Sequence, residues 1–126
     1  MNWLNKTIAY TLPLVPKPIV RRVSARYIAG ESLQDAMDTV RELNRRGFMA
    51  TLDVLGEFVT NEALARRAGD EYLVALDRIR TEALDSNVSI KLTQMGLKID
   101  LELCYDIAAG IVEKAVAQDN YVRIDM

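Results

Sequence analysis

Three short segments of the chain alternate apolar and polar residues, and helical patterns separate them. The segments span residues 48–55, 88–93 and 121–125. Strands that alternate with helices predict a parallel sheet, and strands of such a sheet are usually apolar on both faces because both faces are covered. Here a polar residue stands at every second position, and charge is costly to bury without a partner or a function. The pattern therefore predicts a parallel α/β sheet with one charged, functional face.

The ionisable residues of the three segments fall on one face if the polar faces coincide. Residues two apart in a strand share a face, which brings Asp53, Lys91 and Asp125 together. In a (β/α)8 barrel the chemistry gathers at the C-terminal ends of the strands, where Asp53 and Asp125 lie, with Lys91 one pleat lower. Glu57, in the following loop, can reach over the mouth. An alternative is purely structural: Asp53 forms an ion pair with Lys91, or with Arg123 across the interior.

Capping residues and apolar periodicity predict three helices. The expected N-caps are Ser32, Thr60 or Asn61, and Asp100, and Gly47 is expected at the C′ position after the first helix. Gly69 lies in the middle of the second helix and costs about 1 kcal/mol relative to alanine, which weakens the case for an unbroken helix. The expected inner faces are Leu64, Ala68, Tyr72, Ala75, Ile79 and Ala83 in the second helix, and Cys104, Ile107, Ala108, Ile111, Val112 and Ala115 in the third.

The ends of the second and third strands carry further expectations. Residues 85–87 are expected to form a turn, after which the second strand runs to Gln94 and ends before Gly96. No helical pattern follows the third strand, which leaves a long unpaired edge of the kind that natural sheets avoid. The 126 residues are therefore expected to be the N-terminal part of a larger barrel or open sheet.

Composition excludes several classes of function. The chain has a net charge of -2, no histidine and a single cysteine. It shows no basic excess and no aromatic–basic cluster, so no nucleic-acid partner is expected. Without histidine, and with one thiol, no structural zinc site is expected, and no metal is assigned. Cys104 allows no internal disulfide, fits a reducing cytoplasm and is expected to be an inert core residue.

Residues 1–30 are expected to form an N-terminal helical arm. Its apolar part is too short to span a bilayer, and prolines at positions 13, 16 and 18 mark a turn before a second helix over residues 18–28. The arm is expected to pack against the domain. The alternative is contact with a membrane surface through Trp3, Leu4 and the pair Arg21 and Arg22.

Three motifs resemble the first three strand motifs of the proline dehydrogenase family. They are TLDVLGE at 51–57, VSIKLTQMGL at 88–97 and VRIDM at 122–126, and they occur in the family's order with family-like spacing from about residue 26 onward. The resemblance implies a distorted (β/α)8 (TIM-like) barrel with preceding helices. Residues 31–126 would then be the first three strands and helices of that barrel, which is incomplete in this chain.

The resemblance also implies an activity and roles for five residues. The family binds FAD, oxidises L-proline to 1-pyrroline-5-carboxylate and passes the electrons to a membrane quinone. Lys91 matches the lysine that holds the proline carboxylate, and Asp125 matches a catalytic aspartate beside the substrate and the flavin. Met126 falls where the backbone meets the isoalloxazine. Glu57 matches a glutamate that pairs with a late arginine and gates the pocket, and Asp53 matches an acid near this network.

The chain matches only the first part of the family's barrel. The family's fourth to eighth strands, with further flavin contacts and two carboxylate-binding arginines, have no counterpart here, so the 126 residues alone are expected to be inactive. The expected location of the parent enzyme is the cytoplasm, or the inner membrane face as a peripheral protein.

Two other classes of function remain open. In a metal-assisted barrel enzyme, Asp53, Glu57 and Asp125 would be Mg²⁺ ligands, and in an aldolase Lys91 would form a Schiff base. The other class is a small, non-catalytic α/β interaction domain that completes its sheet with a partner.

Overall fold

Three helix–strand units make up the described part of the chain. The computed structural model describes residues 32–56 and 59–126, so the expected arm and Glu57 lie outside the described residues. The elements are α3 (Leu33–Arg45), β1 (Ala50–Asp53), α4 (Glu62–Thr81), β2 (Ser86–Lys91), the 3-10 helix η2 (Leu92–Met95), α5 (Leu101–Ala117) and β3 (Val122–Asp125). The strands form one open parallel sheet in the order β1–β2–β3, which confirms the predicted α/β class.

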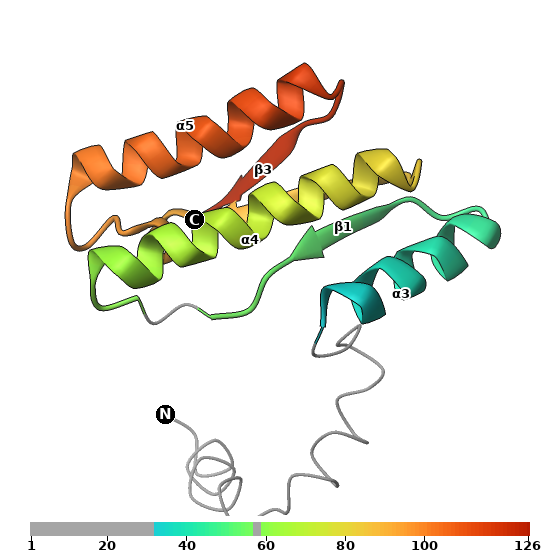
Figure 1. Cartoon of the computed structure of the whole chain (residues 1–126), viewed down its shortest axis with the longest axis horizontal. Coiled ribbons are helices and arrows are strands. Elements are labelled where there is room, and N and C mark those ends of the chain that lie inside the picture. The colour runs from blue at the N-terminus through green and yellow to red at the C-terminus, as the bar shows by residue number, and fades with distance from the viewer. Residues whose placement is uncertain (1–31, 57–58) are drawn as a thin grey trace, which may run out of the picture.

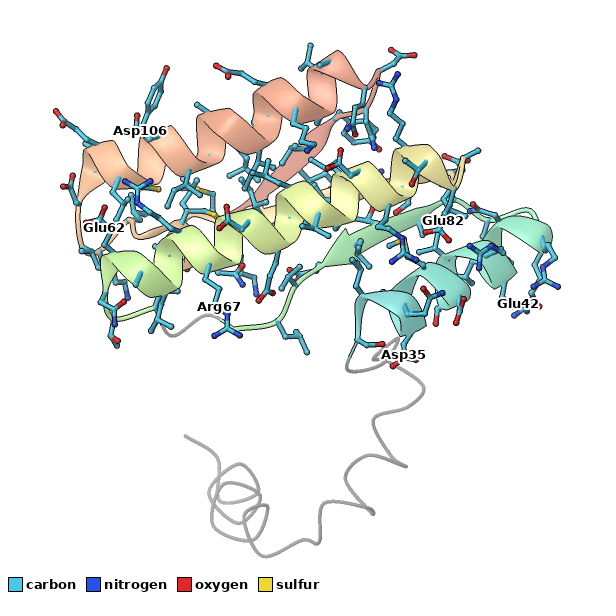
Figure 2. All side chains as sticks on the ribbon, in the orientation of Figure 1. Asp35, Glu42, Glu62, Arg67, Glu82 and Asp106 are labelled. Atoms are coloured by element: carbon cyan, nitrogen blue, oxygen red, sulfur yellow. The ribbon has the colours of Figure 1, made fainter. Side chains whose placement is uncertain are left out.

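The three helices pack against one shared core. They lie side by side in Figure 1, and the core joins Met37 of α3, Tyr72 of α4 and Ile111 of α5 to Val88 and Ile90 of β2. Charged side chains such as those of Glu42, Glu62 and Asp106 project from the outer surfaces of these helices (Figure 2). No helix among the described residues is both long enough and apolar enough to cross a membrane.

Each helix begins at a predicted N-cap. The side chain of Ser32 accepts a hydrogen bond from the Asp35 amide at 3.1 Å, and that of Asn61 accepts one from the Leu64 amide at 2.9 Å. Asp100 caps α5 by accepting from two amides of its first turn. Each such cap stabilises its helix by about 1 kcal/mol, which is why these local signals located the helix starts correctly.

The three helices also end in the same turn. Gly47, Ala83 and Asp119 all have positive φ values, of 87°, 52° and 55°. The next amide donates to a carbonyl five residues earlier in every case: Phe48 to Leu43, Leu84 to Ile79, and Asn120 to Ala115, at 2.8 or 2.9 Å. This is the Schellman pattern, and it confirms Gly47 at C′. Each strand therefore leaves its helix in the same geometry.

The predicted inner face of α4 was partly wrong. Leu64 is 40% exposed, and Ala83 lies beyond the end of the helix. The buried residues are Ala65, Ala68, Gly69, Tyr72, Ala75, Leu76 and Ile79. The buried stripe is turned toward α5, because α4 packs on that helix as well as on the sheet. The helix continues unbroken through Gly69, as predicted, despite the cost of a glycine at its centre.

The bounds of the second strand were also wrong. Ser86 and Asn87, expected in a turn, begin β2 and pair with Ala50 and Thr51 of β1. The strand ends at Lys91, and the next four residues form η2. The strand ladder supplies hydrogen bonds that override the local turn preference of these polar residues. At the C-terminal end of β2, the tight 3-10 turn buries Gln94, whose side chain donates to the Val54 carbonyl just after β1.

Cys104 of α5 is a core residue, as predicted. It is buried, and its thiol donates a long hydrogen bond to the Leu92 carbonyl at 3.5 Å. Burial raises the pKa of this thiol, which disfavours the reactive thiolate. The structure therefore supports a packing role.

Candidate functional site

The face of the sheet opposite the core is polar. Val88 and Ile90 of β2 point into the helical core, so Asn87, Ser89 and Lys91 point to the other side. Ser89 and Asn87 are nevertheless 5% and 2% exposed, because β2 is the central strand. Buried polar groups of this kind need hydrogen-bond partners, and these partners show which residues make up the candidate site.

The strand register brings two of the predicted site residues together. Lys91 of β2 is paired with Asp125 of β3, on strands that lie about 5 Å apart. Asp53 of β1 is paired with Ser89, one pleat lower. Lys91 and Asp125 are therefore direct neighbours of opposite charge, whereas Asp53 lies on the other side of the central strand. Met126 follows β3 and is exposed.

The Asp125 carboxylate is held by a serine of the neighbouring strand. The Ser89 hydroxyl donates to Asp125 Oδ2 at 2.8 Å. The Asp125 side chain is exposed, so one oxygen is bound to the protein while the carboxylate faces the open side of the sheet.

The Asp53 side chain is held by helix α4 and not by a neighbouring strand. The Tyr72 hydroxyl donates to Asp53 Oδ1 at 3.1 Å and accepts from the Val54 amide at 3.1 Å. Gln94 also binds the chain at the end of β1, because its side-chain amide donates to the Val54 carbonyl at 3.0 Å. Burial, with a contribution from the Asp53 charge, raises the pKa of Tyr72 far above its usual value, so the hydroxyl remains a donor. The end of β1 is thus fixed to α4 and η2.

Sequence reasoning placed Tyr72 only in the core and did not identify its role or that of Gln94. A buried tyrosine hydroxyl requires a hydrogen-bond partner, so a tyrosine on an apolar stripe was the available signal. No comparable signal existed for Gln94, because it was expected at the end of a strand.

A second polar pair lies lower on the same face. Asn87 donates to the Tyr121 hydroxyl at 2.8 Å, but its own Oδ1 is buried without a hydrogen-bond partner. Buried acceptors are normally satisfied, so this atom has room for one more donor in the polar layer.

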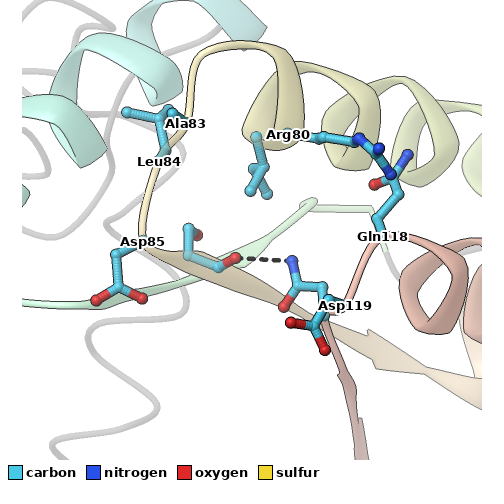
Figure 3. Close-up of a pocket in the computed structure, with 9 residues that line it drawn as sticks. Arg80, Ala83, Leu84, Asp85, Gln118 and Asp119 are labelled. Atoms are coloured by element: carbon cyan, nitrogen blue, oxygen red, sulfur yellow. Dashed lines mark hydrogen bonds between the residues drawn. The ribbon is translucent and has the colours of Figure 1, made fainter.

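The cavity in Figure 3 lies at the other end of the sheet. It measures about 270 Å³ and is lined by the α4–β2 and α5–β3 turns, where Asn120 donates to the Ser86 carbonyl at 2.9 Å. These residues precede the strands, whereas Lys91 and Asp125 stand at the strand ends. The cavity is therefore separate from the candidate site.

Among residues 32–56 and 59–126, no group of three or more histidine, cysteine or acidic residues could hold a metal ion. Asp53 and Asp125 are separated by β2, and Glu57 is outside the described residues. The described geometry therefore offers no support for the magnesium alternative.

Comparison with curated proteins identifies similar sequences. The chain is 38% identical over 117 residues to proline dehydrogenase 1 of Bacillus subtilis subsp. natto, and 35% identical over 106 residues to proline dehydrogenase 2 of Bacillus subtilis strain 168. It is 30% identical over 107 residues to proline dehydrogenase of Deinococcus radiodurans. These matches cover 92%, 84% and 82% of the chain, but only 39%, 35% and 34% of the respective relatives. No protein-family model matches the chain.

Proposed function

The chain is a relative of the proline dehydrogenases over most of its length, and from this relationship we propose that it forms part of an FAD-dependent active site for L-proline oxidation. The relatives' names describe oxidoreductases, and the predicted resemblance to that family is confirmed by the matches. Because the chain spans about two-fifths of their length, the activity is proposed for the protein to which these residues contribute. Residues 1–126 alone are proposed to be inactive.

The neighbouring charges of Lys91 and Asp125 carry the proposal for the substrate. L-Proline is a zwitterion with a carboxylate and a secondary ammonium group one carbon apart. An ammonium group and a carboxylate on adjacent strands, about 5 Å apart, complement both groups of such a molecule. Lys91 binds the carboxylate and fixes the orientation of the ring, and Asp125 faces the amine.

In this proposal Asp125 acts on the substrate proton. The amine of proline must be neutral before its neighbouring carbon can be oxidised. As a general base, the Asp125 carboxylate accepts the proton that leaves the amine, and the charged residues around it stabilise the positive charge that develops on nitrogen during oxidation. Asp53 and Glu57 belong to the surrounding ion-pair network, in which Glu57 gates the pocket.

The end of β3 fits contact with a flavin along one side. Asp125 and Met126 are both exposed there, and β3 is an edge strand within the described part of the chain. The flavin ring is flat and carries polar atoms along its edge. An apolar side chain and the backbone groups beside it can contact such a ring, and we assign this contact to Met126. When bound, FAD accepts the electron pair that leaves proline, and a quinone at the membrane takes the electrons onward. The enzyme is cytoplasmic or peripheral on the inner membrane face.

A (β/α)8 barrel is the proposed complete fold, and the exposed side of α5 supports it. When the matching turns at Ala83 and Asp119 are superposed, Gly69 and Arg80 of α4 correspond to Tyr105 and Val116 of α5. In α4 these positions face α5: Gly69 meets Ile107, and Arg80 donates to the Ala117 carbonyl. In α5 their counterparts are 72% and 68% exposed. A fourth helix packed as α5 packs on α4 would cover them.

Spectroscopy on the full-length natural protein tests the function. The purified protein is expected to show the visible absorbance of oxidised flavin, and L-proline is expected to bleach it without oxygen. A protein without flavin, or one whose flavin proline does not reduce, contradicts the proposal. Covalent trapping of a carbonyl substrate on Lys91 by borohydride would instead support the aldolase alternative.

A further inference from the structure

Ser89 occupies the centre of the polar face but carries no charge and faces no solvent. It is 5% exposed on the central strand, between Asp53 of β1 and Arg123 of β3 in the register. Its hydroxyl has one proton, and it donates that proton to Asp125 Oδ2 rather than to the backbone. A buried hydroxyl that donates to a carboxylate on the next strand does more than fill space in the sheet, because it can orient that carboxylate.

Ser86, on the same strand, shows what a structural serine does here. It is also 5% exposed, but its hydroxyl donates to a backbone carbonyl, that of Asn87, at 3.1 Å. The two serines therefore have equal burial on one strand, but they lie on opposite faces of the sheet and donate to different acceptors. Only Ser89 contacts a residue of the candidate site.

The hydrogen bond restricts where the Asp125 carboxylate can point. Asp125 is near the end of β3 and exposed, so its side chain has little packing to select a rotamer. A hydroxyl–carboxylate bond is charge-assisted and directional, and it fixes Oδ2 over β2. The second oxygen, Oδ1, then occupies a defined position on the open side, beside Lys91 in the register.

We propose that Ser89 is a positioning residue that holds the Asp125 carboxylate by Oδ2, so that Oδ1 meets the amine of the bound amino acid. The proposal rests on the proposed function, because Asp125 must face the substrate for its orientation to matter. Ser89 acts through Asp125 and does not touch the substrate. Displacement of a reacting group by about 1 Å can cost about a hundredfold in rate.

Kinetics of three variants in the full-length, flavin-loaded protein test this role. Ser89→Ala is expected to lower kcat by about tenfold to a hundredfold, with the proline KM nearly unchanged because Lys91 still holds the carboxylate. Ser89→Thr keeps the hydroxyl and is expected to restore most of the activity. Ser86→Ala, the matched control, is expected to behave like the wild type. If the alanine variant does not fold, Ser89→Cys, with its weak thiol donor, replaces it.

A readout without turnover completes the test. Three-bond NMR couplings of Asp125 are expected to report one χ1 rotamer in the wild type and an average of several in Ser89→Ala. Full activity and a single rotamer in Ser89→Ala would overturn the role of Ser89. A flavin-loaded wild type that does not oxidise proline would instead overturn the proposed function.

Discussion

Gly69 of α4 lies so close to Ile107 of α5 that a β-carbon at residue 69 would be 2.6 Å from Ile107 Cγ2. Real β-carbons essentially never come so close to another atom, so an alanine would force the Ile107 side chain, or the helix that carries it, to shift. The glycine that weakens α4 as an isolated helix is therefore what allows α4 and α5 to pack.

Gly69→Ala is expected to lower the free energy of unfolding by about 1–3 kcal/mol through overpacking, although alanine favours the helix by about 1 kcal/mol. Urea denaturation of the full-length protein measures the change. Adding Ile107→Ala removes the clashing methyl group and is expected to make the alanine at residue 69 less costly. A gain in stability from Gly69→Ala alone would show that the helices have room to spare.

Ala83→Gly is expected to stabilise the protein by about 1 kcal/mol. Ala83 has a φ of 52°, and a left-handed conformation costs a residue with a β-carbon about 1–2 kcal/mol, which glycine avoids. Thermal unfolding measures the change. Ala75→Gly, in the buried middle of α4, is the opposite control and is expected to destabilise.

Tyr72→Phe is expected to lower the free energy of unfolding by about 1–3 kcal/mol at neutral pH. The ring remains, but the half-buried Val54 amide loses its acceptor and Asp53 loses a donor. Tyr105→Phe is the control, because Tyr105 is 72% exposed. Equal losses in the two variants would contradict a special role for the Tyr72 hydroxyl.

Tyr72 also predicts a loss of stability in alkali. Its pKa is raised in the folded protein, so above about pH 10 the unfolded chain releases the tyrosine proton while the folded protein keeps it. Stability is then expected to fall as the pH rises above about 10, and less steeply in Tyr72→Phe. Urea titrations of both proteins between pH 8 and about 11 check the slope, and identical slopes would argue against the buried hydroxyl as the cause.

Lys91→Ala is expected to raise the proline KM about tenfold or more, because the carboxylate loses a charged hydrogen-bond donor. Flavin content is expected to remain nearly unchanged. Steady-state kinetics and the flavin absorbance of the full-length protein separate these two quantities. Lys98→Ala is the control, since Lys98 is an exposed lysine in the loop before α5. A wild-type KM in Lys91→Ala would remove Lys91 from the carboxylate site.

Local signals in the sequence located the helix ends well. Ser32, Asn61 and Asp100 cap helices through atoms within three residues of themselves, and a short stretch of sequence contains all that such a bond needs. Gly47 was predictable for the same reason, because its turn closes within its own helix end.

Features that depend on distant residues were missed. Ser86 and Asn87 have turn-forming side chains, yet pairing with β1 places them in a strand. The reason for Gly69 was also missed, because the Ile107 side chain that leaves no room for a β-carbon there belongs to the next helix. The partner of Asp53 was missed because Tyr72 reaches it from the next helix. The shared polar face could be anticipated from strand parity, but the individual hydrogen bonds on it could not.

The length of the short connection between α5 and β3 determines which side chains of β3 lie on the polar face of the sheet. Asp125 adjoins Lys91 only because Val122 is aligned with Val88, and successive strand residues point to opposite sides. Deleting one residue from the segment 119–121 would turn Ile124 toward the charged side and send the Asp125 carboxylate among the hydrocarbon side chains. The length of that connector is therefore as much a determinant of the site as the aspartate itself.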